Sequence, residues 1–115
     1  MDLDLKWLDY QGACPASIVY FNTLGDHEEG AVIESLYNDE HWAWTIWLIT
    51  HLIEDDTDWS NFTGTYYGDS SLTKTQLFEN CINGFGEENT EDNSIYLFDT
   101  SKIDTLKTNY YTWTA

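Results

Sequence analysis

The strongest hydrophobic pattern in the chain lies in residues 41–53. Aromatic and aliphatic side chains recur there at the three- and four-residue spacing of one helix face, at Trp44, Trp47, Leu48, His51 and Leu52. A second apolar face is supplied by Trp42, Ile46, Ile49 and Ile53. A helix that is apolar around so much of its circumference is typical of a central core helix. We therefore expect a core helix here, capped at its N-terminus by Asn38 or Asp39.

Shorter helices are predicted before this segment. Pro15 suits the first position of a helix, where its missing N–H costs nothing, and the apolar stripe that follows it ends at Gly25. Asp26 is the expected N-cap of the next helix, whose first turn carries acidic residues that the helix dipole favours. Residues 3–10, which end at the break made by Gly12, fit either a strand or a helix.

The C-terminal half predicts a mixture of strands and one helix. An alternating run rich in threonine and tyrosine indicates a strand at 61–67, and 94–98 indicates a second strand. Between them lie an amphipathic helix at 72–82 and an acidic loop at 85–93, and the last residues fit a helical turn followed by an aromatic strand or tail. We expect a single α+β domain over 1–115, with a helical N-terminal half packed on a small antiparallel sheet.

The charge balance changes what this fold is expected to do. The 115 residues include 21 Asp and Glu against 4 lysines and no arginine, so the formal net charge is -17. This excludes proteins that grip nucleic-acid phosphates, which need a basic surface. The chain has neither a GxxxxGK[ST] nor a GxGxxG motif, which argues against nucleotide enzymes. Aromatic residues make up 17% of the chain, which favours a folded domain with an aromatic core under an acidic surface.

The sequence gives no indication of membrane insertion or secretion. No apolar run reaches the roughly 18 residues of a membrane span, and the N-terminus lacks the basic and apolar regions of a signal peptide. We therefore expect an intracellular, cytoplasmic protein with Cys14 and Cys81 as free thiols. So many aromatic residues would also permit a homodimer through an exposed apolar patch.

Catalytic and metal-binding patterns are weak. Cys14 with a histidine would make a nucleophile pair, but the chain has little positive charge to activate a thiol. The three histidines lack the i, i+4 spacing of a metal pair, and the acidic run from Asp56 lacks the Gly and Glu of a calcium loop at its sixth and twelfth positions. A carboxylate pair for glycoside hydrolysis would find little room for a sugar cleft. We expect no catalytic residue, metal ligand or cofactor.

The acidic clusters are the strongest candidates for a binding site. Four carboxylates directly follow the helix predicted at 41–53, where a helix C-terminus disfavours negative charge, and such a broken rule often marks function. Trp59 and Phe85 flank the clusters as anchors or as core residues. The candidate partner-binding residues are Asp39, Glu40, Glu54, Asp55, Asp56, Asp58, Glu87, Glu88, Glu91 and Asp92.

The magnitude of the charge indicates a partner. A globular chain of this length is about 35 Å across. Duplex DNA carries one charge per about 1.7 Å, so 17 charges correspond to about 30 Å of duplex. A compact scaffold with this charge is expected to imitate a phosphate backbone and to bind a basic nucleic-acid-binding host protein, with no direct contact to nucleic acid or membrane.

In size and charge, the chain resembles the small acidic inhibitors encoded by phages and mobile elements, among them anti-restriction proteins, uracil-DNA glycosylase inhibitors and anti-CRISPR proteins. The opening Gly-Ala-Cys-Pro at 12–15 and the Trp-x-x-Trp-Leu at 44–48 are also similar to a helical segment of uncharacterised phage proteins. These resemblances imply a phage or prophage inhibitor of a host CRISPR effector, restriction enzyme or repair glycosylase, and assign no residue-level role.

Other hypotheses remain open at this point. The acidic surface is also explained by plain solubility or by adaptation to high salt, although the latter is usually accompanied by arginine. An acidic structural or adaptor protein would bind a protein partner through exposed aromatics. A small hydrolase using Cys14 or a carboxylate pair is a third class.

Overall fold

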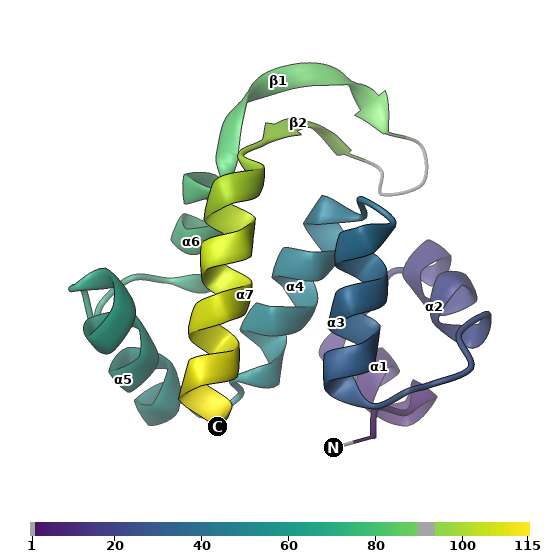
Figure 1. Ribbon diagram of the computed structural model, residues 1–115, viewed down its shortest axis with the longest axis horizontal. Helices are drawn as coiled ribbons and strands as arrows, with labels where there is room; N and C mark the ends of the chain where they lie inside the picture. Colours follow the sequence, from purple (N-terminus) through teal and green to yellow (C-terminus); the bar gives the residue numbers. More distant parts are fainter. Residues whose placement is uncertain (1, 90–93) are drawn as a thin grey trace.

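Helices dominate the fold, and one antiparallel hairpin completes it (Figure 1). The computed structural model describes residues 2–89 and 94–115. Within them the elements are α1 (Leu5–Gln11), α2 (Pro15–Asn22), α3 (Glu29–Asn38), α4 (Trp42–Leu52), α5 (Asp56–Tyr67), α6 (Lys74–Asn80), β1 (Ile82–Asn89), β2 (Ser94–Phe98) and α7 (Thr100–Thr114). The predicted α+β class is confirmed, and the longest extent of 36 Å matches the expected size.

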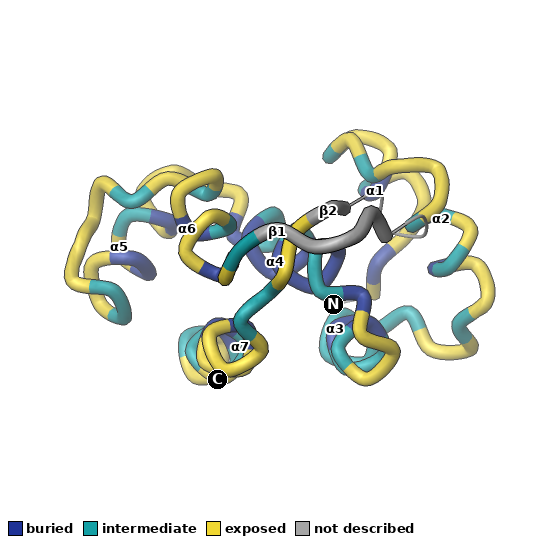
Figure 2. Tube along the Cα trace, turned by 90° about the horizontal axis from the view of Figure 1, so that it is seen from above, coloured by how far each residue is buried: buried dark blue, intermediate teal, exposed yellow. Residues whose placement is uncertain are grey.

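The predicted core helix is confirmed as α4. Ile46 and Ile49 are fully buried, and α3 and α7 pack against one side of the helix. Viewed from above in Figure 2, buried residues follow α4 through the middle of the molecule, whereas half of the residues of the outer helices α2 and α5 are exposed. The predicted cap is wrong: Asn38 ends α3 and Asp39 follows it, so His41 occupies the N-cap of α4 without a side-chain cap bond.

Helices α3 and α7 are fastened together by polar contacts across their surface. The Glu34 carboxylate pairs with Lys107 Nζ at 2.9 Å and accepts a hydrogen bond from the Tyr111 hydroxyl at 2.6 Å. These contacts, led by the Tyr111 hydrogen bond, lower the pKa of Glu34. Lys107 also lies 3.9 Å from the Tyr37 ring centroid, and Tyr110 donates to Glu29 at 2.8 Å.

The turn between α3 and α4 contains a strained residue. Glu40 has φ 61°, a left-handed conformation that L-residues with a Cβ disfavour by about 1–2 kcal/mol. The Glu40 N–H donates to the Tyr37 carbonyl and the His41 N–H donates to the Leu36 carbonyl. These two bonds are those of a Schellman motif, in which the left-handed position is usually glycine.

The strand predicted at 61–67 is wrong, because these residues form the C-terminal part of α5. The Asp55 carboxylate accepts from the Asp58 N–H at 3.0 Å and starts the helix. One helix face then buries Trp59, Phe62 and Thr63. Packing on this face overrides the strand preference of the threonines and tyrosines, since strand propensity depends strongly on context.

The remaining elements agree with the prediction in part, and two of them differ from it in type. The helix predicted at 72–82 begins later, after a Thr73–Gln76 capping box, and ends at Asn80, because Ile82 pairs with β2. The predicted acidic loop 85–93 is partly β1. The predicted second strand is confirmed as β2, whereas the expected C-terminal turn and aromatic tail form the single helix α7. Pro15 begins α2 as predicted, and residues 3–10 contribute most of α1.

Candidate functional site

Three helices begin at the same end of the molecule, where both chain termini also lie (Figure 1). Each of these helices, α1, α3 and α5, has an acidic N-cap. Asp4 accepts from the Trp7 N–H at 2.7 Å, and Glu28 accepts from the Ala31 N–H at 3.1 Å. Asp55 is the acidic N-cap of α5. The expected cap of α3, Asp26, lies outside the helix and instead accepts from the Glu28 N–H at 3.0 Å.

Contacts between distant segments hold this end together. Asp2 forms an antiparallel bridge with Glu28, which ties the N-terminus to the start of α3. Glu54 accepts from Trp7 Nε1 at 2.6 Å and from Gln11 Nε2 at 2.7 Å, which ties α1 to the α4–α5 link. We call this surface the acidic end; its carboxylates are Asp2, Asp4, Asp26, Glu28, Glu29, Glu54, Asp55, Asp56 and Asp58.

Helix dipoles explain how the acidic end tolerates its charge. Three of the four carboxylates expected to sit unfavourably at a helix C-terminus lie instead at the start of a helix, because α4 ends at Leu52 and Asp55 is the N-cap of α5; Glu54 directly follows the C-cap of α4. Asp56 and Asp58 lie in the first turn of α5, where the dipole stabilises each negative charge by about 0.3–1 kcal/mol. One lysine, Lys6, lies in the first turn of α1. The carboxylates are therefore concentrated at this end, and four of them, Asp4, Asp26, Glu28 and Asp55, are fixed in orientation by backbone N–H groups.

The structure separates the predicted partner-binding residues. Glu54, Asp55, Asp56 and Asp58 are exposed and lie together at the acidic end. Asp39 and Glu40 lie at the opposite end of α4, whose eleven residues span about 16 Å. Of the other four, Glu87 and Glu88 lie in β1, and their side chains are not among those described. Glu91 and Asp92 lie outside the described residues.

Sequence reasoning missed the contributions of Asp4 and Glu28 to the same surface. The signal was present for Asp4, because an aspartate directly before an apolar segment is a typical N-cap. Trp59, a suggested anchor, is 8% exposed and donates from Nε1 to the Leu72 carbonyl at 2.7 Å, so it belongs to the core. The side chain of Phe85 is not among those described.

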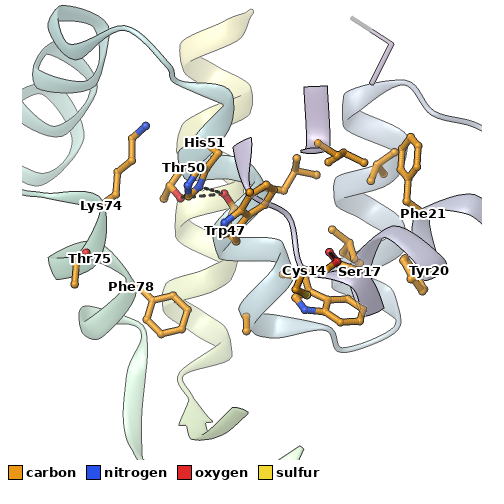
Figure 3. Close-up of a pocket in the computed structure, with 17 residues that line it drawn as sticks. Cys14, Ser17, Tyr20, Phe21, Trp47, Thr50, His51, Lys74, Thr75 and Phe78 are labelled. Carbon is orange, nitrogen blue, oxygen red and sulfur yellow. Dashed lines mark hydrogen bonds between the residues drawn. The ribbon is translucent and has the colours of Figure 1, made fainter. Parts of the chain in front are cut away.

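A second feature of the molecule is an apolar pocket of about 410 Å³ on the side of α4 away from α7. Figure 3 shows its labelled side chains: α6 supplies one wall, α2 supplies part of the other, and α4 lies between them. Among the lining residues are Leu8, Cys14, Tyr20, Phe21, Trp44, Trp47, Leu48, His51, Lys74, Thr75 and Phe78. Within residues 2–89 and 94–115, none of the side chains described as lining the pocket belongs to an aspartate or a glutamate.

His51 is the distinctive polar group of this pocket. Its Nδ1 lies 2.7 Å from the Trp47 carbonyl oxygen, so Nδ1 carries the proton and donates. Its ring stacks on the Trp47 indole at 4.3 Å between centroids. Burial lowers the pKa of His51. The hydrogen bond to the Trp47 carbonyl acts in the opposite direction, and the nearby charge of Lys74 lowers the pKa further. The neutral ring leaves Nε2 as an acceptor, and no partner for Nε2 occurs in the described part of the chain.

The two cysteines are free thiols in different surroundings, and the other two histidines stack on aromatic rings. Cys14 is exposed at the pocket, whereas Cys81 is buried, and burial raises the pKa of its thiol to about 11. His27 stacks on Phe21 and His41 stacks on Trp44. Over residues 2–89 and 94–115, no group of three or more His, Cys, Asp or Glu side chains is placed to hold a metal ion.

No helix in the described ranges combines the length and the apolar character that crossing a bilayer requires. The comparison with protein-family models, curated proteins and solved structures found no match for the sequence.

Proposed function

We propose that this protein is a non-enzymatic inhibitor from a phage or mobile element that binds a host nucleic-acid-binding enzyme by imitating the charge of a phosphate backbone. The enzyme classes expected are CRISPR effectors, restriction enzymes and repair glycosylases. The partner surface is the acidic end, and the interaction takes place in the cytoplasm of an infected or lysogenic host cell. The partner offers a basic groove, so the protein itself needs no nucleic acid, metal or cofactor.

The observation that carries the proposal is the convergence of acidic caps from α1, α3 and α5 at one end of the fold. A charge spread only for solubility has no need of fixed orientation. Here Asp4, Glu28 and Asp55 are each held by a backbone N–H, and Glu54 is held by two side-chain donors. Fixed charges bind a basic groove with less loss of side-chain entropy than mobile ones.

The test compares the protein with two triple variants that each remove three negative charges. The first, Glu54→Gln with Asp56→Asn and Asp58→Asn, neutralises part of the acidic end but keeps the Asp55 cap. The control, Glu40→Gln with Glu79→Gln and Asp104→Asn, neutralises exposed carboxylates elsewhere. Neutral isosteres are preferred to lysines, because lysine in the first turn of α5 would oppose the helix dipole.

Each protein is immobilised, exposed to bacterial lysate at low salt and eluted with NaCl, and the eluted proteins are identified by mass spectrometry. The wild type and the control variant should capture nucleic-acid-binding enzymes that added duplex DNA releases. The acidic-end variant should lose them. Equal capture by all three proteins, or captured enzymes that duplex DNA fails to release, would contradict the proposal.

The alternative is an acidic adaptor that docks on a protein through exposed aromatics. Tyr10, 86% exposed, is the observation that favours it, while Trp44 and Trp59 are both buried. The salt dependence of partner binding distinguishes the two proposals. The affinity falls steeply with NaCl if the protein imitates a phosphate backbone, and it changes little if aromatic side chains make the contact.

A further inference from the structure

The pocket over α4 has the features of a small-molecule site. Its volume of about 410 Å³ falls in the range of about 300–1,000 Å³ that is usual for ligand pockets. Its polar groups are few. His51 of α4 lies toward the α6 wall with Lys74 and Thr75, as Figure 3 shows. On the opposite wall, the hydroxyls of Ser17 and Tyr20 donate to the Cys14 carbonyl and to Asp39. The proposal for this site does not rest on the proposed function, although Lys74 of the pocket lies in the field of Glu54 and Asp56 of the acidic end.

The walls select the shape of the ligand. Trp44, Trp47, Tyr20 and Phe78 line the pocket from three different helices. Aromatic side chains favour flat aromatic partners, which stack on them or meet them edge to face. Figure 3 shows Phe78 and Trp47 on neighbouring sides of the same hollow. A flat ring system between these residues would bury apolar surface that the fold leaves uncovered.

The polar side selects the chemistry of the ligand. Because the Nδ1 proton of His51 is committed to the Trp47 carbonyl, Nε2 is left to accept a hydrogen bond. A fitting ligand therefore supplies a donor. Lys74 Nζ donates to the Ile53 carbonyl at 2.8 Å and has further N–H groups for a ligand oxygen. A hydroxyl group meets both needs, since its oxygen accepts and its proton donates.

The charges in and around the pocket further limit the class of ligand that fits it. Among the residues that the structure describes, no carboxylate lines the pocket, so a cationic ligand would lack a direct partner among them. The protein's net charge of -17 repels anions from solution. We propose that this pocket binds an uncharged aromatic molecule bearing a hydroxyl group, with its rings among Trp44, Trp47 and Phe78 and its hydroxyl donating to His51 Nε2.

The test uses 2-naphthol as the probe, measured by equilibrium dialysis at neutral pH with the full chain. The comparison compound is 2-methoxynaphthalene, which has similar rings and no donor. We expect saturable binding of 2-naphthol, and binding of the ether that is weaker by about fivefold, as one lost hydrogen bond predicts. Bound 2-naphthol should also slow the alkylation of Cys14 by iodoacetamide, because Cys14 lines the pocket.

Two variants locate the binding. His51→Phe keeps an aromatic ring on Trp47 and removes the acceptor, so it should bind the two compounds equally. Ala43→Phe fills the pocket and should abolish binding of both. Buried Cys81 reports the fold in each variant, because it stays unalkylated while the protein is native. No saturable binding, a preference for 2-naphthol retained in folded His51→Phe, or unchanged binding in folded Ala43→Phe would overturn the proposal.

Discussion

Replacing Asp55 tests whether helix caps hold the acidic end in place. On a chain with net charge -17, removal of a carboxylate lowers the self-repulsion of the surface and is expected to stabilise the fold. The structure predicts the opposite at this residue, because the Asp55 carboxylate caps α5 through the Asp58 N–H at 3.0 Å. Loss of such a cap costs about 1 kcal/mol. For a domain of this size, that corresponds to a decrease in melting temperature of about 4 °C.

The matched control is Asp104, which is exposed within α7 and caps no helix. Asp104→Ala removes the same charge and improves helix propensity, so its free energy of unfolding should be unchanged or higher. Asp55→Asn keeps a capping oxygen and should lose only the dipole contribution, a few tenths of a kcal/mol. The assay is urea unfolding followed by tryptophan fluorescence. Equal or greater stability of Asp55→Ala relative to the wild type would refute the capping argument.

Four further outcomes follow from the same structure. Glu40→Gly should raise the free energy of unfolding by about 1 kcal/mol, because glycine relieves the left-handed strain at φ 61°; a decrease measured by urea unfolding would contradict this. The reagent DTNB should label Cys14 rapidly and Cys81 only on unfolding, and equal rates would be inconsistent with the burial of Cys81. Burial, aided by Glu29, raises the pKa of Tyr110, so the free energy of unfolding should be constant up to a pH of about 10 and then fall, by up to about 1.4 kcal/mol per pH unit from this residue. Absorbance at alkaline pH should show part of the tyrosine ionisation only as the protein unfolds, and complete ionisation of the native protein would contradict this. The melting temperature should rise with added NaCl, because salt screens repulsion between carboxylates, and a flat or falling trend would argue against a strongly repelling surface.

Local sequence patterns correctly predicted those helices whose own residues carry a clear signal, either an apolar face or a residue that starts a helix. The apolar circumference of α4 identified the core helix, and Pro15 placed the start of α2. α5 was missed because its threonines and tyrosines favour strands in isolation. Its helical state depends on packing of Phe62 against residues distant in sequence, such as Trp113 at 5.9 Å between ring centroids. α7 was missed for a similar reason, since Tyr110 and Tyr111 find their partners on α3.

The candidate site was only partly predictable. The cluster from Glu54 to Asp58 is contiguous in sequence, so composition alone identified it. Asp4 and Glu28 lie on the same surface as this cluster only because α1, α3 and α5 all begin at the acidic end. Tertiary packing sets that arrangement. The pocket was beyond sequence reasoning, because Cys14, His51 and the α6 residues converge only in the folded chain.

The most direct test of the central claim is the affinity for a captured host enzyme as a function of NaCl concentration. Charge imitation predicts that the dissociation constant rises steeply with salt, that duplex DNA competes for the same site, and that neutralising Glu54, Asp56 and Asp58 flattens the salt dependence. A dissociation constant that is independent of salt and unchanged in that variant would contradict the claim.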